Sequence, residues 1–434
     1  MLQTNTVLIE IEVLFMNIGS IIKYYRTKKG LTQTDLAEGI CSISHLSKIE
    51  TNMYTANEET VNLLLSKLGL KLQDITGDLR EIRDTLEAFM HAICMHDRES
   101  IEQLYQELLE KEDYILTSEY VNLYHLYKLR YCLFHWDHQG VQESLKMIQK
   151  IKNTFDPVEK NILLFFRGFY HSMNEKYEEG LKAVHEFLNN PLPIGGMWVA
   201  EASYILSHLY TSINDNEAAL TFSKKAYDVY VAESNFTRQV HSQMILGISY
   251  MRLSLYSEAL TVYKSLLRNT RMFFKATLYP GVLINYARCL YLVKDYTKAK
   301  KAADEAIELS EPFSYAYGTS LLIWLESKVK LNDIDKSWHS RMRLLKETDA
   351  IIGNKYFYHH SNFLEKYEFS QPAGIKYAVK YLYPHLLKLQ SFSDALEVLE
   401  MIIDYYESIG DVEKVNHYYS QWRKLISKER RSNE

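Results

Sequence analysis

Residues 30–51, GLTQTDLAEGICSISHLSKIET, hold a dense group of side chains that form directional hydrogen bonds. The group consists of Gln33, Ser42, Ser44, His45 and Lys48. Amide, hydroxyl, imidazole and ammonium groups can donate to phosphate oxygens and can pair with the edges of bases. These residue types therefore suit recognition of double-stranded DNA, provided that they share one exposed surface.

The apolar residues of this stretch are few, and their spacing predicts two short helices. Thr32 is expected to cap the first helix with Asp35 three residues later, and residues 39–42 are expected to turn the chain. The second helix then needs only Leu46 and Ile49 for its buried face. A capped helix, a tight turn and a helix that exposes most of its surface form the pattern of a helix-turn-helix unit.

Further helices are expected on both sides of this unit, over residues 17–29, 58–68 and 70–79. Arg26, Lys28 and Lys29 are candidate phosphate contacts. Glu50 and Asp35 are interpreted as structural residues. Asn52 is expected to adopt the left-handed conformation where related sequences have glycine.

The segment LTQTDLAEGICSISHLSKIE resembles the Xre type of helix-turn-helix found in phage repressors. The resemblance implies that Gln33 contacts phosphate or base. It also implies that Ser42, Ser44, His45 and Lys48 contact base edges in the major groove. The alternative is a small helical bundle with a charged surface and no DNA partner.

A second candidate site lies in INYARCLYLVKDY, where Asn285 precedes Arg288 by about one helical turn. A carboxamide that faces a groove can both donate to and accept from the backbone of an extended peptide. Arg288 is expected to pair with a carboxylate of that peptide. The alternative for Asn285 is an ordinary surface or capping residue. Ile205 and Ile245 occupy the equivalent positions upstream, so no ladder of amides is expected.

The segments around these residues repeat along the chain. Leu181, Leu220, Leu260 and Lys300 occupy equivalent places and lie 39, 40 and 40 residues apart. Each copy pairs two amphipathic helices, with a small residue (Ala219, Ala259 or Ala299) where the helices approach closely. The pattern resembles the tetratricopeptide repeat, which implies a right-handed superhelix whose concave face binds a peptide. Residues 311–388, with Pro372 and Pro384, are expected to be less regular.

Other chemistry has little support. Cys132, His135 and His138 are three residues apart, but no fourth ligand is evident, so no metal is predicted. No nucleotide-binding or hydrolase motif is present, so neither a catalytic residue nor a cofactor is predicted.

Composition predicts an all-α cytoplasmic protein. The 434 residues contain only 7 prolines and 16 glycines, and the formal net charge is −5. The four scattered cysteines suggest reduced, buried thiols, and no apolar run is long enough for a membrane span. Residues 1–16 lack the basic start of a signal peptide, and Met16 is a candidate for the true start.

The expected domains are an N-terminal extension (1–16), a helix-turn-helix domain (17–79), a helical linker (80–115) and a repeat domain (116–434). This order resembles the Rap–Rgg–NprR–PlcR group of peptide-pheromone receptors, especially its NprR and PlcR branch. The resemblance implies a quorum-sensing transcription regulator that forms a homodimer or larger oligomer and binds a DNA operator and a short imported signalling peptide. NprR-type members also bind a sporulation phosphorelay protein. The alternative function is therefore a regulator that binds a response-regulator or phosphorelay protein through its repeats.

Overall fold

The structure, a computed structural model, describes residues 18–190, 195–273, 278–389 and 391–431. Within these ranges the regular secondary structure is helical and contains no strand, so the predicted all-α class is confirmed. The chain divides into two compact units, Met1–Pro193 and Ile194–Glu434. The predicted extension over residues 1–16 and the candidate start at Met16 lie outside the described residues.

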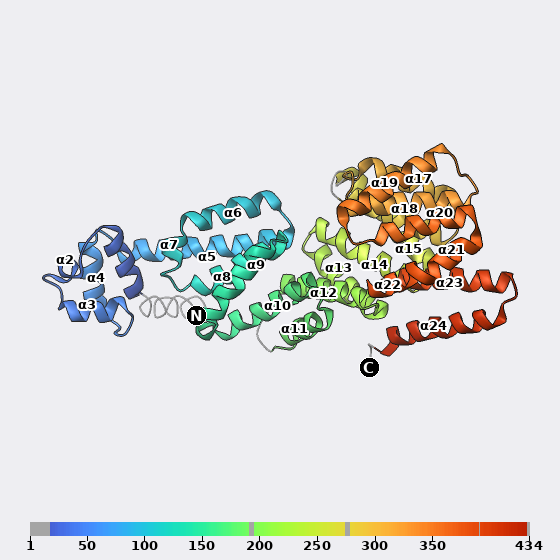
Figure 1. The fold of residues 1–434 in the computed structure, drawn as a ribbon. Coiled ribbons are helices and arrows are strands. Elements are labelled where there is room, and N and C mark those ends of the chain that lie inside the picture. The colour runs from blue at the N-terminus through green and yellow to red at the C-terminus, as the bar shows by residue number, and fades with distance from the viewer. Residues whose placement is uncertain (1–17, 191–194, 274–277, 390, 432–434) are drawn as a thin grey trace. The chain divides into compact units, whose positions relative to one another are not determined.

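The first unit begins with a group of short helices (Figure 1). They are the helix over 18–28, α2 (Gln33–Ala37), α3 (Ile43–Glu50) and α4 (Glu58–Lys67), followed by the longer α5 (Leu72–Met95). Thr32 caps α2 in a reciprocal capping box with Asp35, as predicted. Ser42 caps α3 through a hydrogen bond from the His45 backbone N–H to its side chain. Leu46 and Ile49 are the buried apolar residues of α3, which leaves most of that helix free for another partner.

The remaining helices of the first unit form antiparallel pairs. They are α6 (Arg98–Glu110), α7 (Glu112–Ile115), α8 (Val121–Phe134), α9 (His138–Ile151), a 3-10 turn (Lys152–Thr154), α10 (Pro157–Met173) and α11 (Tyr177–Asn189). The expected boundary at residues 79 and 80 falls inside α5, which runs on without a break. The second half of α5 packs against α6 and α8, so residues 80–115 take part in a helical layer.

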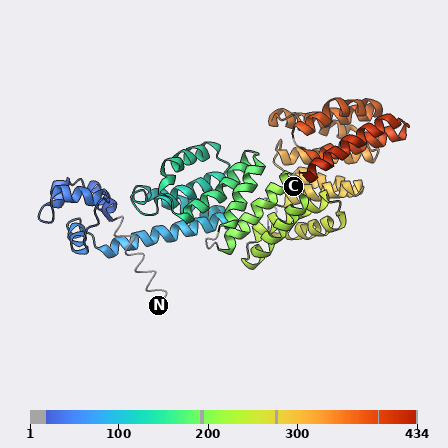
Figure 2. The same cartoon turned by 90° about the horizontal axis from the view of Figure 1, so that it is seen from below.

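The second unit continues the series of helical pairs, visible from two directions in Figures 1 and 2. Its helices are α12 (Gly196–Ser212), α13 (Asn216–Ala232), α14 (Phe236–Arg252), α15 (Tyr256–Phe273), α16 (Tyr279–Leu292), α17 (Tyr296–Leu309), α18 (Tyr315–Lys330), α19 (Lys336–Ile352), α20 (Tyr356–Phe369), α21 (Gln371–Tyr377), a π-helical turn (Ala378–Leu382), α22 (Tyr383–Lys388), α23 (Phe392–Ser408) and α24 (Val412–Arg431).

The predicted period of about 40 residues is present in the backbone. Asn214, Ser254 and Lys294 each have a positive φ in the turn between the two helices of a pair. The second helix of each pair starts two residues later. Near its start the small residues Ala219, Ala259 and Ala299 are fully buried, as expected where two helices pack closely.

Successive pairs pack mainly through the second helix of one pair and the first helix of the next, as α13 does with α14 and α17 with α18. The first helices also contact one another: α14 contacts α12 and α16, and α18 contacts α16 and α20. The first helices therefore form one continuous layer. Any groove along this layer is lined by side chains about 40 residues apart in the sequence.

The segment around the two prolines departs from the regular pairs, as expected. Pro372 stands in the first turn of α21, where a missing backbone N–H costs little. Pro384 is the second residue of α22, which follows the π-helical turn without a break in the helical run. The π-helical turn lies between these two helices. In the described part of the chain, every helix is too short or too polar to traverse a lipid bilayer.

Candidate DNA-contact surface and groove

The N-terminal end of α3 presents an exposed polar surface. Ser42, Ser44 and Lys48 are exposed, as their predicted role requires. The Ser42 hydroxyl accepts a hydrogen bond from the His45 backbone N–H at 3.2 Å and lies 3.2 Å from the Ser44 hydroxyl. Because Ser42 caps the helix, its side chain has less freedom for a base contact than the Ser44 side chain has.

His45 is half-buried and packs against a residue that sequence reasoning missed. Its ring meets the ring of Tyr54 edge to face, with the centroids 4.6 Å apart. Tyr54, Met53 and Ile43 are all exposed apolar residues on or just after α3. Exposed apolar groups beside a polar helix face can contact thymine methyl groups or sugars. The sequence offered one sign of this apolar surface: Ile43 follows the capping residue Ser42 and does not share the spacing of the buried Leu46 and Ile49.

Arg26 does not face outward, which revises its expected role. Its Nε and one terminal nitrogen donate to the two carboxylate oxygens of Glu50 at 2.5 and 3.0 Å, and the other terminal nitrogen donates to the Leu31 carbonyl. The amide of Gln33 also donates to Glu50, at 2.8 Å. Glu50 is only 3% exposed, which agrees with its expected structural role. The structure thus places Arg26 in an internal ion pair and leaves Gln33 half-buried beside it.

The two lysines after Arg26 differ in their surroundings. Lys28 is exposed, and its ammonium lies 3.3 Å from the Tyr24 hydroxyl, so it is free to turn toward a phosphate. Lys29 donates to the carbonyl of Leu68 at the C-terminal end of α4 at 2.5 Å. Asn52 has a φ of 55°, the left-handed conformation expected for it.

The second unit contains a groove of about 800 Å³ along the layer of first helices. Its lining comes mainly from α12, α14, α16, α18, α20, α23 and α24, with the first residues of α13 and α15. Asn285 and Arg288 both line this groove. The structure therefore brings the two predicted peptide-contact residues into one cavity wall.

Asn285 differs from its counterparts in the neighbouring repeats. Ile245 and Ile205, one and two repeats upstream, are buried in the core. Asn285 is half-buried and borders the groove. Its amide is thus a polar group in a place where the other repeats have apolar side chains.

Arg288 is already bound to carboxylates of the protein. It donates to Glu326 on α18 at 2.9 Å and to Glu397 on α23 at 2.5 Å, and it lies 4.0 Å from Asp394. The sequence suggested that the Arg288 guanidinium would pair with a carboxylate of the ligand, but in the structure it pairs with carboxylates of the protein. Glu397 is 109 residues away in sequence, so no local pattern could have indicated the contact.

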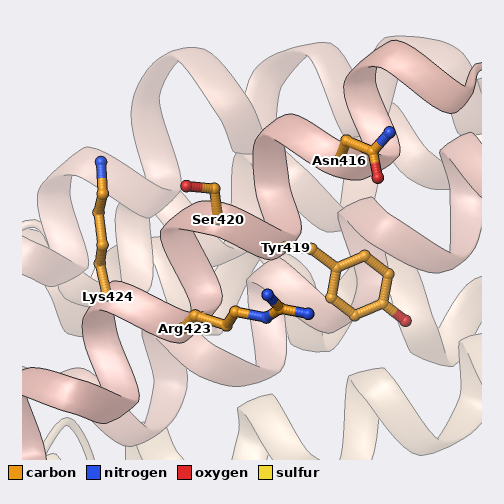
Figure 3. Close-up of a pocket in the computed structure, with 5 residues that line it drawn as sticks. All are labelled: Asn416, Tyr419, Ser420, Arg423 and Lys424. Atoms are coloured by element: carbon orange, nitrogen blue, oxygen red, sulfur yellow. The ribbon is translucent and has the colours of Figure 1, made fainter.

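Among the described residues, no cluster of three or more His, Cys, Asp or Glu side chains is arranged to hold a metal ion. His135 pairs with Glu102 at 3.1 Å, and the Cys132 thiol lies 3.9 Å from the Ser144 hydroxyl. No disulfide joins the four cysteines, and Cys41 is only half-buried, unlike the expectation of four buried thiols. A smaller hollow of about 340 Å³ is formed by α24 alone, from five exposed residues along one face (Figure 3).

Comparison with known proteins identifies the first part of the chain. Residues 22–75 match the family model described as "Helix-turn-helix". This segment is a helix-turn-helix domain. The match includes α2, the intervening turn and α3, so it places the exposed surface of α3 where such domains contact DNA.

The sequence of this chain is similar to that of a transcriptional activator. The transcriptional activator NprA of Geobacillus stearothermophilus is 27% identical over 233 residues, which cover 52% of this chain and 56% of NprA. The aligned part thus spans little more than half of the curated relative.

Solved structures share the fold. The apo form of the quorum sensor NprR from B. thuringiensis has a TM-score of 0.65 at 19% identity and covers 80% of this chain and 99% of its own. NprR in complex with its cognate peptide NprX has a TM-score of 0.61 at 20% identity, with 80% and 99% covered. A Rap protein complexed with Competence and Sporulation Factor has a TM-score of 0.68 at 14% identity, with 81% and 99% covered. The predicted fold is confirmed, and the predicted resemblance to the Rap–Rgg–NprR–PlcR group holds for its NprR and Rap structures.

Proposed function

We propose that this chain is a cytoplasmic transcription regulator whose binding to a DNA operator is controlled by a short signalling peptide. The observation that carries the proposal is the presence, in one chain, of a helix-turn-helix domain and of a groove lined by successive repeats. The similarity to NprA supports the regulatory role, and the fold shared with NprR supports the peptide site.

The DNA contacts are assigned to one face of α3. Ser44 and Lys48 are the assigned base-contact residues, and His45 is held at the edge of this surface by Tyr54. Ser42 acts mainly as the helix cap, with Lys28 as a phosphate contact. Gln33 remains an assigned DNA-contact residue, because its side-chain amide has donor and acceptor capacity beyond the one hydrogen bond that it donates to Glu50. A two-fold homodimer would place two such helices on a near-palindromic operator.

The peptide contact is assigned to Asn285. An extended peptide exposes unpaired backbone N–H and C=O groups, and a carboxamide satisfies one of each without selecting a side chain. Ligand binding can alter DNA binding only if the peptide has different affinities for two arrangements of the protein. The fold shared with a Rap protein supports a second candidate function, in which the repeats bind a phosphorelay protein.

The test combines both halves of the proposal. Random duplex DNA is selected on the purified full chain, with and without a mixture of synthetic heptapeptides. We expect an enriched sequence whose recovery changes when peptide is present. Enrichment that is identical in both conditions would contradict peptide control, and no enriched sequence at all would contradict operator binding.

A further inference from the structure

The groove of the second unit has an excess of negative charge. Its charged lining residues are Asp215, Glu217, Arg252, Arg288, Asp394, Glu397 and Glu400. Five carboxylates thus face two guanidinium groups within the described lining. A groove of about 800 Å³ with low-dielectric walls concentrates the field of such an imbalance.

Both guanidinium groups are already engaged by the protein. Arg252 donates to the Thr211 carbonyl at 2.6 Å and to the Asn214 side chain at 3.1 Å, at the turn between α12 and α13. Arg288 is shared among the three carboxylates described above. A ligand carboxylate would therefore have to displace Glu397 or Glu326 before it could bind Arg288.

The cluster around Arg288 is not neutral. Glu326, Asp394 and Glu397 surround a single positive charge, while Glu400 continues the acidic face of α23 at the next turn. Burial, together with the neighbouring Asp394 and Glu326 carboxylates, raises the pKa of Glu397 to about 7 even though Arg288 acts in the opposite direction. The single positive charge of Arg288 therefore does not balance the carboxylates around it near neutral pH.

Aromatic rings line the same part of the groove. Tyr315, Tyr356, Phe392 and Trp422 are all lining residues, and Tyr315 is 53% exposed. The Tyr356 hydroxyl donates to Asp394 at 2.8 Å, which ties these rings to the acidic cluster. Carboxylates next to aromatic faces are a combination that binds ammonium and guanidinium groups.

We propose that the groove selects a peptide carrying a lysine or arginine side chain, and that this side chain lies against Glu397 and Asp394. The proposal rests on the proposed function, because it assumes that the groove binds a peptide. It reverses the charge expected from the sequence, since Arg288 is satisfied internally and the lining holds more carboxylates than guanidinium groups.

The test uses three fluorescein-labelled heptapeptide mixtures on the full chain. Each mixture has one fixed residue, Arg, Gln or Glu, scanned through every position, and uncharged residues elsewhere. Fluorescence polarisation measures the affinity. We expect the best Arg mixture to bind about tenfold tighter than its Gln counterpart, and this preference to weaken as salt is added. Glu397→Gln should reduce the preference, whereas Glu308→Gln, which removes an exposed charge from α17 outside the groove lining, should leave it unchanged.

The outcomes separate this inference from the proposed function. Equal binding of all three mixtures, lost in Asn285→Ala, would overturn the charge preference and leave the peptide site in place. Tighter binding of the Glu mixture would overturn it in favour of Arg288 as a carboxylate receptor. If no mixture binds, the proposed peptide function fails, and this inference fails with it.

Discussion

Arg26 of the first helix and Glu50 at the end of α3 form a two-point ion pair inside the helix-turn-helix domain. The two residues are 24 positions apart in sequence, and their pair joins the first helix to α3. Gln33 at the start of α2 donates to the same carboxylate, so one buried acidic residue connects three helices. The orientation of α3 therefore depends on a polar contact as well as on Leu46 and Ile49.

Glu50→Ala should loosen this domain without affecting the repeats. Removal of one partner of a buried ion pair typically costs about 3–5 kcal/mol, because the remaining charge loses its partner. Hydrogen–deuterium exchange of the full chain should show faster exchange in peptides from residues 18–68 and unchanged exchange in the second unit. Glu59→Ala, at an exposed position, is the control. Unchanged protection in Glu50→Ala would show that the apolar core alone orients α3.

Lys48→Ala and Ser44→Ala should each weaken operator binding while the fold persists. Loss of one base contact costs about 1–3 kcal/mol of binding free energy. Gel-shift titration on the selected operator measures the effect. Arg80→Ala also removes one positive charge, from an exposed position on α5 beyond the matched residues 22–75, and should have little effect. If both α3 variants retain full affinity, α3 is not the DNA-contact helix.

Asn285→Ala should weaken peptide binding and leave operator affinity without peptide unchanged. The lost amide makes about one good hydrogen bond in each direction, so a decrease of about tenfold is expected. Calorimetric titration with the best mixture measures it. Asn269→Ala removes an exposed amide from α15 outside the groove lining and serves as the matched control. Equal affinities in the two variants would remove Asn285 from the site.

Glu397 should make stability depend on pH near neutrality. Its pKa is about 7, above the ordinary carboxyl value, chiefly because burial and the Asp394 and Glu326 carboxylates oppose ionisation more than Arg288 favours it. Tyr356 and the buried His360 of α20 complete the surroundings through their interactions with Asp394. The folded state therefore holds a proton that the unfolded state releases, and this contribution to stability is lost as pH rises from about 4.5 to about 7.

Glu397→Gln keeps the neutral form at every pH. We expect it to match the original chain near pH 5 and to exceed it near pH 8, by on the order of 1–3 kcal/mol. Urea unfolding of the full chain at both pH values, followed by hydrogen exchange in α23, measures the difference. A variant that is less stable at pH 8 would show that the ion pair with Arg288 outweighs the repulsion among the three carboxylates.

Local patterns were sufficient for much of the first domain. The Thr32 cap, the left-handed Asn52 and the buried Leu46 and Ile49 depend on residues within a few positions of one another. Helix capping and periodicity are local effects, so they appear directly in the sequence. The 40-residue period was equally visible in the sequence, because each pair of helices packs closely at an equivalent alanine (Ala219, Ala259 or Ala299).

The roles of the two arginines could not be predicted in this way. Arg26 and Arg288 have the residue type and spacing of ligand-contact groups, yet each is paired inside the protein. The partners are 24, 38 and 109 residues away, so only the packing of distant helices brings them together.

The sequence by itself determined the helices, their caps, the repeat and the helix-turn-helix domain, because these follow from interactions along a single helix or between neighbours in the chain. The tertiary structure decided which charged groups remain open to a ligand. Whether a charged side chain attracts a ligand depends on how far the opposite charges around it balance it, and that balance depends on all the helices that surround it. For this reason Asn285 kept its expected place in the groove, while the expected charge of the ligand changed sign.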